Sequence, residues 1–264
     1  MQKNTVKEKL RAGKCAYGTS LEDCLDPEMA VVLAAAGLDF FFIDTEHCTG
    51  TYADIQRLCR AARPAGIVPL VRVPQNEPHL LSRAADSGPM GVIVPRVHSV
   101  DEAKAAVRAL KFPPLGRRGF GLRSIITDLR SHSAAEEIES CNQETMVVLM
   151  IESEEGLSSV EEIAAVPGVD ALFVGPYDLT LSLGIVEQFD NPIFWQALDR
   201  VIDAATQNGI AAGLQTRDME LLLETRRRGG RFLLYASDTA VLFEGYRNAM
   251  RTLKAATNES RISY

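Results

Sequence analysis

Residues 40–47 read Phe40-Phe41-Phe42-Ile43-Asp44-Thr45-Glu46-His47, so that an apolar run ends in three ionisable side chains. Strands that are buried on both faces of a parallel sheet appear as continuous apolar runs. Enzymes built on parallel α/β barrels place their catalytic groups at the carboxyl ends of such strands. We therefore expect residues 40–46 to form a buried strand, and Asp44, Glu46 and His47 to lie at a functional site.

The same kind of apolar run recurs along the chain, with amphipathic segments in between. The eight expected strands are 16–20, 40–46, 68–73, 91–95, 146–152, 171–175, 210–215 and 232–237. The expected helices are 27–36, 51–63, 77–87, 99–110, 156–165, 193–208 and 217–228. Eight strands that alternate with helices in 264 residues predict one (β/α)8 TIM barrel, a single α/β domain over residues 1–264, rather than an open sheet.

One connection, residues 112–145, breaks this rhythm. It begins with Pro113 and Pro114, and Gly116, Gly119 and Gly121 follow closely, a composition that argues against a helix at its start. Long connections in compact barrels are often active-site loops. We therefore expect this segment to lie near the functional site.

The composition fits a globular protein that binds neither nucleic acids nor membranes. Hydrophobic residues make up 46% of the chain, and 28 Lys and Arg against 35 Asp and Glu give a net charge of −7. This charge disfavours binding to nucleic acids and anionic membranes, although one or two arginines would suffice for an anionic substrate. No apolar stretch approaches the roughly 20 residues of a membrane span. Five cysteines without a CxxC pair predict no disulfide framework and a cytoplasmic location.

Two further strand ends carry carboxylates. Glu152 directly follows an apolar strand, so its side chain needs a cation or a paired group. Asp178 follows the next strand, in what we expect to be a tight turn with exposed backbone amides. Two convergent carboxylates suit a hard divalent ion such as Mg²⁺ or Mn²⁺. A structural salt bridge between Glu152 and a barrel arginine is the alternative.

The strand ends also supply a base and a cation. Histidine is the side chain best suited to proton transfer near neutral pH, so His47 is a natural general base, and Asp44 or another nearby acid could fix its tautomer. Arg72 ends an otherwise apolar strand, where it could stabilise an oxyanion or bind a carboxylate. Structural ion pairing is the competing interpretation of Arg72. Cys48 could be a nucleophile, but a small filler beside the site is the simpler interpretation.

Several mechanisms lack support in the sequence. No lysine ends a predicted strand, which disfavours a Schiff-base aldolase. The chain has no GxGxxG opening a helix after a strand, no Walker loop and no GxSxG elbow. Nicotinamide, nucleotide and serine-hydrolase activities are therefore not indicated.

Several motifs stand out in combination: Ile43-Asp44-Thr45-Glu46-His47, the segment from Pro69 to Pro78, Gly91-Val92-Ile93-Val94-Pro95, Phe112 to Gly119, Ile151-Glu152-Ser153, Gly168-Val169-Asp170, and Phe173 to Leu179. Together they resemble the HpcH/HpaI family of metal-dependent pyruvate aldolases, which includes 4-hydroxy-2-oxoheptanedioate aldolase and 2-dehydro-3-deoxyglucarate aldolase. The similarity covers about residues 12–250.

The resemblance implies roles for individual residues. Glu152 and Asp178 match the family's ligands for a divalent metal ion, Mg²⁺, Mn²⁺ or Co²⁺. His47 matches the catalytic base, and Arg72 matches the group that stabilises the enolate and carbonyl oxygens. Asp86 matches an acid that raises the basicity of this histidine across a subunit interface. The family also implies a C-terminal helix swapped between the subunits of a dimer, and a homohexamer formed as a trimer of dimers.

The substrate-binding positions match the family only in part. The amides around Tyr177 and Asp178, preceded by Gly175, match the cradle for the pyruvate carboxylate. Tyr177 replaces a small residue, and Met150 stands where the family usually has a glutamine that contacts the substrate. Arg96 could replace that polar contact, bind a distal carboxylate, or form an outward salt bridge.

The resemblance predicts a class II pyruvate aldolase, which cleaves or forms a C–C bond of a 4-hydroxy-2-oxo acid through a metal-bound pyruvate enolate. Its small-molecule partners would be a keto acid, pyruvate or oxaloacetate, and an aldehyde. Decarboxylation of oxaloacetate uses the same enolate and stays open, as does a catalytically silent barrel that only binds a keto acid. A CoA-ester lyase is less favoured, because no basic stretch is available for the CoA phosphates.

Overall fold

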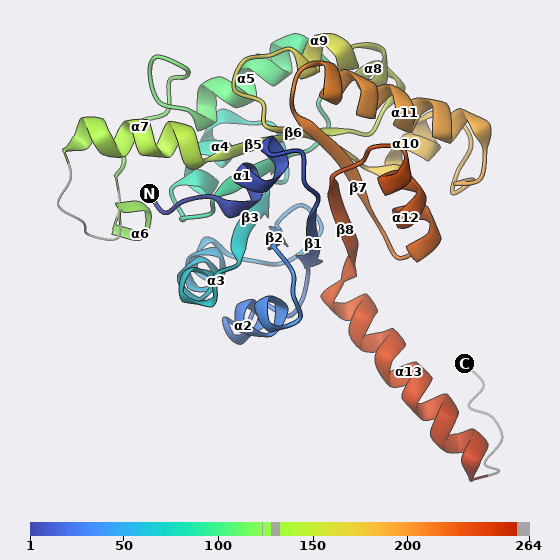
Figure 1. Cartoon of the computed structure of the whole chain (residues 1–264). Coiled ribbons are helices and arrows are strands. Elements are labelled where there is room, and N and C mark those ends of the chain that lie inside the picture. The colour runs from blue at the N-terminus through green and yellow to red at the C-terminus, as the bar shows by residue number, and fades with distance from the viewer. Residues whose placement is uncertain (123, 128–132, 258–264) are drawn as a thin grey trace.

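The eight strands of the computed structural model, which describes residues 1–122, 124–127 and 133–257, close into a parallel barrel in chain order (Figure 1). The predicted TIM barrel is thereby confirmed, and each predicted strand matches an observed strand to within two residues at either end. The strands are β1 (Ala16–Leu21), β2 (Phe40–Asp44), β3 (Val68–Arg72), β4 (Gly91–Val94), β5 (Met146–Ile151), β6 (Ala171–Val174), β7 (Ala211–Thr216) and β8 (Phe232–Ser237).

Aromatic rings fill the interior of the barrel. The rings of Phe40 and Phe232 stack with centroids 4.6 Å apart, and Phe173 meets Phe232 edge-on at 5.7 Å. Gly18 on β1 leaves room for this packing, because a Cβ at this position would lie 2.6 Å from the ring of Phe40. An interior packed this closely leaves no space for charged side chains between the two ends of the barrel. Charged side chains on the strands are therefore restricted to the strand ends.

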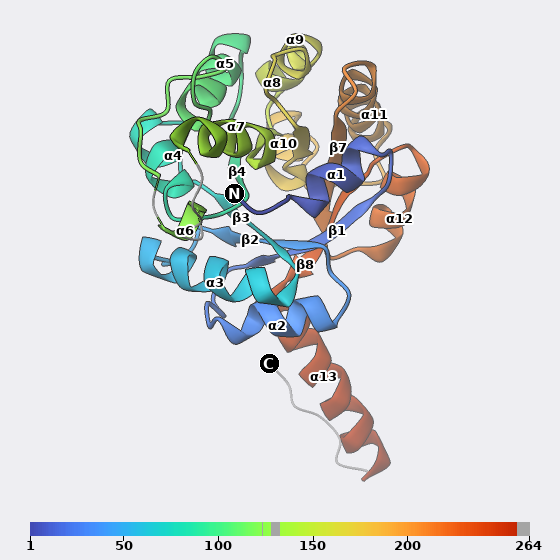
Figure 2. The same ribbon diagram turned by 60° about the vertical axis from the view of Figure 1, so that its left-hand side comes forward.

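Helices surround the barrel on its outside, as Figure 2 shows. The predicted helix over 156–165 is divided at Ser159 into two short helices. The surrounding helices are α2 (Glu28–Ala35), α3 (Tyr52–Ala65), α4 (Pro78–Ala85), α5 (Val100–Leu110), α8 (Glu154–Ser158), α9 (Val160–Ala164), α10 (Pro176–Ser182), α11 (Pro192–Gln207) and α12 (Met219–Arg227).

A short helix that the sequence pattern did not reveal closes the amino end of the barrel. It is α1 (Thr5–Arg11), and its Val6 and Leu10 pack into the same apolar cluster as the barrel interior. Asn4 caps its first turn by accepting a hydrogen bond from the amide of Lys7. The barrel is therefore closed at this end and open at the other.

The expectation that residues 112–145 form an active-site loop is wrong for the described part of this segment. It contains α6 (Ser124–Thr127) and α7 (Ala134–Glu144), and α7 contacts the amino terminus of the chain. The amino group of Met1 lies 3.0 Å from Glu137, and the amide of Asn4 donates to Glu144 at 2.7 Å. The physical reason is connectivity: the segment follows a helix and leads into a strand, which places it at the amino end of the barrel.

The last helix, α13 (Asp238–Ala256), points away from the barrel (Figures 1 and 2). Several of its large apolar side chains are exposed, namely Val241, Leu242, Phe243, Tyr246, Met250 and Leu253. Among the described residues, no helix combines the length and the apolar character needed to cross a membrane.

Candidate active site

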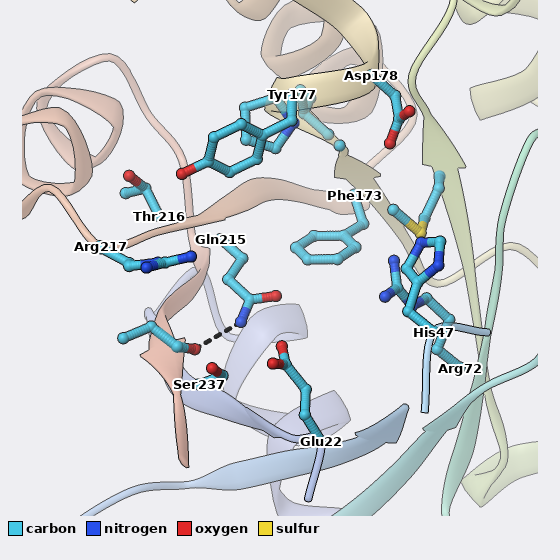
Figure 3. Close-up of a pocket in the computed structure, with 15 residues that line it drawn as sticks. Glu22, His47, Arg72, Phe173, Tyr177, Asp178, Gln215, Thr216, Arg217 and Ser237 are labelled. Atoms are coloured by element: carbon cyan, nitrogen blue, oxygen red, sulfur yellow. Dashed lines mark hydrogen bonds between the residues drawn. The ribbon is translucent and has the colours of Figure 1, made fainter. Parts of the chain in front are cut away.

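A cavity of about 300 Å³ opens at the carboxyl ends of the strands (Figure 3). Of the predicted site residues, His47, Arg72, Met150, Gly175, Tyr177 and Asp178 line it. Glu152 and Asp178 border a smaller hollow of about 190 Å³ together with Arg96. The structure thus brings the residues from β2, β3, β5 and β6 together at one end of the barrel.

Arg72 and Asp44 form a buried ion pair at the rim. They are register partners on β3 and β2, and the Nε and Nη2 atoms of Arg72 donate to the two oxygens of Asp44 at 2.9 and 2.6 Å. Burial acts to raise the pKa of Asp44, but the hydrogen bonds and the charge of Arg72 outweigh it and hold this pKa below its usual range. Arg72 thus forms the ion pair that the structural interpretation expects, but its guanidinium also lines the cavity, so its role toward substrate oxygens stays a prediction.

His47 lies beside Glu46 rather than Asp44. Its Nε2 is 3.8 Å from Oε2 of Glu46, and its side chain is 57% exposed. Both oxygens of Asp44 are occupied by Arg72, and one of them also accepts from the amide of Glu46. The expected contact between Asp44 and His47 is absent from the hydrogen bonds and ion pairs of the described chain, because Asp44 points into the barrel while His47 lies beyond the strand.

Asp86 does not line the cavity of its own chain. It lies at the end of α4 and accepts a 2.7 Å hydrogen bond from Arg118. The role across a subunit interface that the resemblance implies stays a prediction.

Glu152 is a buried carboxylate that forms no ion pair with any other residue in the described ranges, although the charge of Arg72 acts on it from a distance. Its Oε1 accepts a 2.6 Å hydrogen bond from the amide of Arg96, whose φ of 54° lies in the left-handed region. Burial raises the pKa of Glu152 to about 7; the Arg96 amide opposes this shift, and the charges of Glu46 and Asp178 add to it. No ion pair found within the described ranges joins Glu152 to an arginine, so the salt-bridge alternative is not observed.

The pair of Glu152 and Asp178 fits a divalent ion. Within the described ranges of the chain, no group of three or more His, Cys, Asp or Glu side chains is arranged to hold a metal. Mg²⁺, however, commonly uses one or two protein carboxylates and completes its octahedron with water and substrate oxygens. Gly175 keeps space open beside Glu152, because a Cβ there would lie 2.5 Å from Oε2 of Glu152.

Tyr177 and Asp178 lie in the first turn of α10 and not in the tight turn expected from the sequence. The first amides of a helix have no acceptor within the helix, so this segment still offers free donors. The ring of Tyr177 is 46% exposed and packs edge-on against Phe189, with centroids 5.4 Å apart. Met150 is buried and lies beside Phe173 on the floor of the cavity.

The surroundings of Cys48 disfavour its thiolate form. Burial, together with the nearby charge of Asp44, raises the pKa of its thiol to about 12. A thiol nucleophile reacts as the thiolate. The interpretation as a small filler is therefore favoured.

Five polar residues at the other end of the cavity received no role from the sequence: Glu22, Gln215, Thr216, Arg217 and Ser237. They follow or end β1, β7 and β8. Because they lie at the ends of predicted strands, the sequence could have indicated them as site residues.

The family model described as HpcH/HpaI aldolase/citrate lyase matches residues 24–244. The chain belongs to this family. The predicted resemblance is thereby confirmed, and it extends over nearly the whole barrel.

Members of the family with known names resemble the chain along most of its length. Hydroxypyruvate/pyruvate aldolase of Paraburkholderia phytofirmans is 34% identical over 96% of this chain and 98% of its own. A 4-hydroxy-4-methyl-2-oxoglutarate aldolase of Chaetomium globosum is 35% identical over 80% of this chain and 79% of its own. The crystal structure of an HpcH/HpaI aldolase from Desulfitobacterium hafniense superimposes with a TM-score of 0.89 at 36% identity, and covers 94% of this chain and 96% of its own.

We predict that Gly175→Ala weakens metal binding by about 10-fold or more, because the added methyl group displaces the carboxylate of Glu152. The measurement is the rise in melting temperature as Mn²⁺ is titrated into each protein. The matched control is Gly119→Ala, since a Cβ at Gly119 meets no atom within 4 Å. Equal Mn²⁺ affinity in Gly175→Ala and wild type would contradict this role of the space beside Glu152.

Proposed function

We propose that this protein is a class II pyruvate aldolase that uses Mg²⁺, Mn²⁺ or Co²⁺ to cleave or form the C–C bond of a 4-hydroxy-2-oxo acid. The observation that carries the proposal is the grouping of Glu152, Asp178, His47 and Arg72 at the mouth of one barrel. The relatives named as aldolases of pyruvate and other oxo acids agree with a carbon–carbon lyase. The donor would be a keto acid and the acceptor an aldehyde.

Glu152 and Asp178 would hold the metal ion. When bound, a divalent cation supplies Lewis-acid stabilisation of negative charge on the oxygens of a keto acid. Among the pocket residues, Gly175 leaves the space next to Glu152 free. The amides of Tyr177 and Asp178, in the first turn of α10, would donate hydrogen bonds to the carboxylate of the keto acid.

Arg72 and His47 would handle charge and protons. Arg72 is fixed by Asp44 and also lies 3.4 Å from Glu46, so its guanidinium is positioned before the substrate binds. A preorganised cation of this kind stabilises negative charge that develops on oxygen. His47 is exposed enough to move a proton between the hydroxyl of the aldol and solvent. Phe173 and Met150 form an apolar floor that limits the entry of water.

We also propose that the enzyme works in the cytoplasm as a homo-oligomer, a hexamer of three swapped dimers. The exposed apolar side chains of α13 support an interface, because a contiguous apolar surface of this kind is normally covered. Asp86 lines no part of the cavity in its own chain, so its predicted action on His47 requires a second subunit.

The test of the proposed function is deuterium exchange into the methyl group of pyruvate in D₂O, followed by mass spectrometry. We expect exchange with Mg²⁺, Mn²⁺ or Co²⁺ and loss of exchange with EDTA. His47→Ala should lower the turnover rate by about 100-fold, since general acid–base groups accelerate reactions by about 10²–10⁴-fold. His79→Ala is the control, because His79 is exposed on α4 outside the cavity.

Absence of exchange with all three metals would favour a barrel that only binds a keto acid. Exchange combined with decarboxylation of oxaloacetate, and with no reaction toward any aldehyde, would favour the decarboxylase. Either result would contradict the proposed aldolase function.

For the oligomer, we predict that the double variant Phe243→Glu, Tyr246→Glu lowers the molar mass in light scattering and lowers turnover with it. These side chains are 61% and 70% exposed, and a carboxylate would have to be buried at the interface. Val186→Glu, an exposed apolar position outside α13, should leave the mass unchanged. A dissociated variant with full turnover would argue against a role for Asp86 across subunits.

A further inference from the structure

The cavity has a second polar end that the proposed chemistry does not use. Figure 3 shows His47, Arg72 and Asp178 on one side of Phe173, and Glu22 and Gln215 on the other. A substrate bound at the metal end would extend over Phe173 toward this second end. If the proposed function is correct, the aldehyde half of the aldol lies there.

The amide of Gln215 is fixed in one orientation. Its Nε2 donates to Oγ of Ser20 at 2.7 Å and to the carbonyl oxygen of Ala236 at 2.5 Å. Since a carbonyl oxygen can only accept, the NH₂ group must face Ala236. Both of its donors are thereby used, and the carbonyl oxygen of Gln215 is directed into the cavity (Figure 3).

Glu22 is held beside Gln215 by a rigid loop. The carboxylate of Asp238 accepts hydrogen bonds from three successive amides, those of Glu22, Asp23 and Cys24, at 2.7–3.2 Å. Oε1 of Glu22 accepts from Oγ of Ser20 at 3.0 Å. The carboxylate of Glu22 points into the cavity from this anchored position (Figure 3).

These contacts place two hydrogen-bond acceptors, one of them charged, at this end of the cavity. Acceptors select ligands that donate, and a hydroxyl group is the donor that an aldehyde substrate can carry. A carboxylated aldehyde would be repelled by Glu22, and an alkyl aldehyde would offer no donor to the half-buried acceptors of Glu22 and Gln215. Arg217 would favour an anionic group, but its side chain lies exposed on the rim.

We infer that Glu22 and Gln215 bind the hydroxyl groups of the acceptor, so that the aldehyde substrate is a short, neutral hydroxyaldehyde. This inference rests on the proposed aldolase function and names the class of its acceptor. It assigns the specificity of the reaction to residues on β7 and after β1, away from the metal-binding carboxylates.

The test compares three aldehydes with pyruvate and Mg²⁺: glyceraldehyde, propanal and succinic semialdehyde. For the wild type we expect kcat/KM for glyceraldehyde to exceed that for each of the other two by about 10-fold or more. Glu22→Gln should lower the ratio of glyceraldehyde to propanal by about 10-fold, since a charged acceptor is lost. Glu155→Gln, an exposed acid on α8, is the control and should leave this ratio unchanged.

A wild-type preference for propanal or succinic semialdehyde would overturn the inference, as would an unchanged ratio in Glu22→Gln. If Arg217→Ala removes activity toward succinic semialdehyde while glyceraldehyde is a poor substrate, the acceptor is anionic and the inference is wrong. Deuterium exchange into pyruvate by the wild type distinguishes a wrong acceptor class from a wrong aldolase function. Exchange without the predicted preference overturns only the acceptor class, whereas absence of exchange overturns the aldolase as well.

Discussion

The ion pair between Arg72 and Asp44 connects the charged mouth of the barrel to its apolar interior. Both residues end strands whose preceding inward side chains belong to the interior cluster, and Asp44 is 1% exposed. Removing one partner of a buried ion pair leaves an unpaired charge, which typically costs about 3–5 kcal/mol. The pair therefore fixes the carboxyl ends of β2 and β3 relative to each other. This also positions Glu46 and His47, which follow β2.

Around this pair, carboxylates outnumber guanidinium groups. When all are ionised, four carboxylates against two guanidinium groups leave an excess of two negative charges; they belong to Asp44, Glu46, Glu152, Asp178, Arg72 and Arg96. Burial is the main cause of the raised pKa of Glu152, and the negative charges of Glu46 and Asp178 raise it further. A divalent cation beside Glu152 and Asp178 would balance the excess. Charge balance at the site therefore requires a bound cation in addition to the folded barrel.

The sequence predicted the barrel because buried parallel strands produce apolar runs whose ends are easy to recognise. The same reasoning placed Glu152, Asp178 and Arg72 at the mouth of the barrel, where the structure has them, since each is a charged residue that ends or follows an apolar strand. It could not find the partner of His47, because the direction of Asp44 depends on its register with Arg72. The orientation of Gln215 was also inaccessible, because it depends on hydrogen bonds across β1 and β8. The role of Asp86 was predicted only from the family resemblance, and no contact within one chain tests that role.

The most direct test of the central claim is the number of Mn²⁺ ions bound per chain, measured by electron paramagnetic resonance of free Mn²⁺ during a titration. We expect one saturable site in the wild type and loss of this site in Glu152→Gln, a variant that keeps the shape of the side chain and removes its charge. Saturable binding of equal strength in both proteins, or no saturable site in the wild type, would contradict the claim that the excess negative charge at the barrel mouth is there to hold a metal ion.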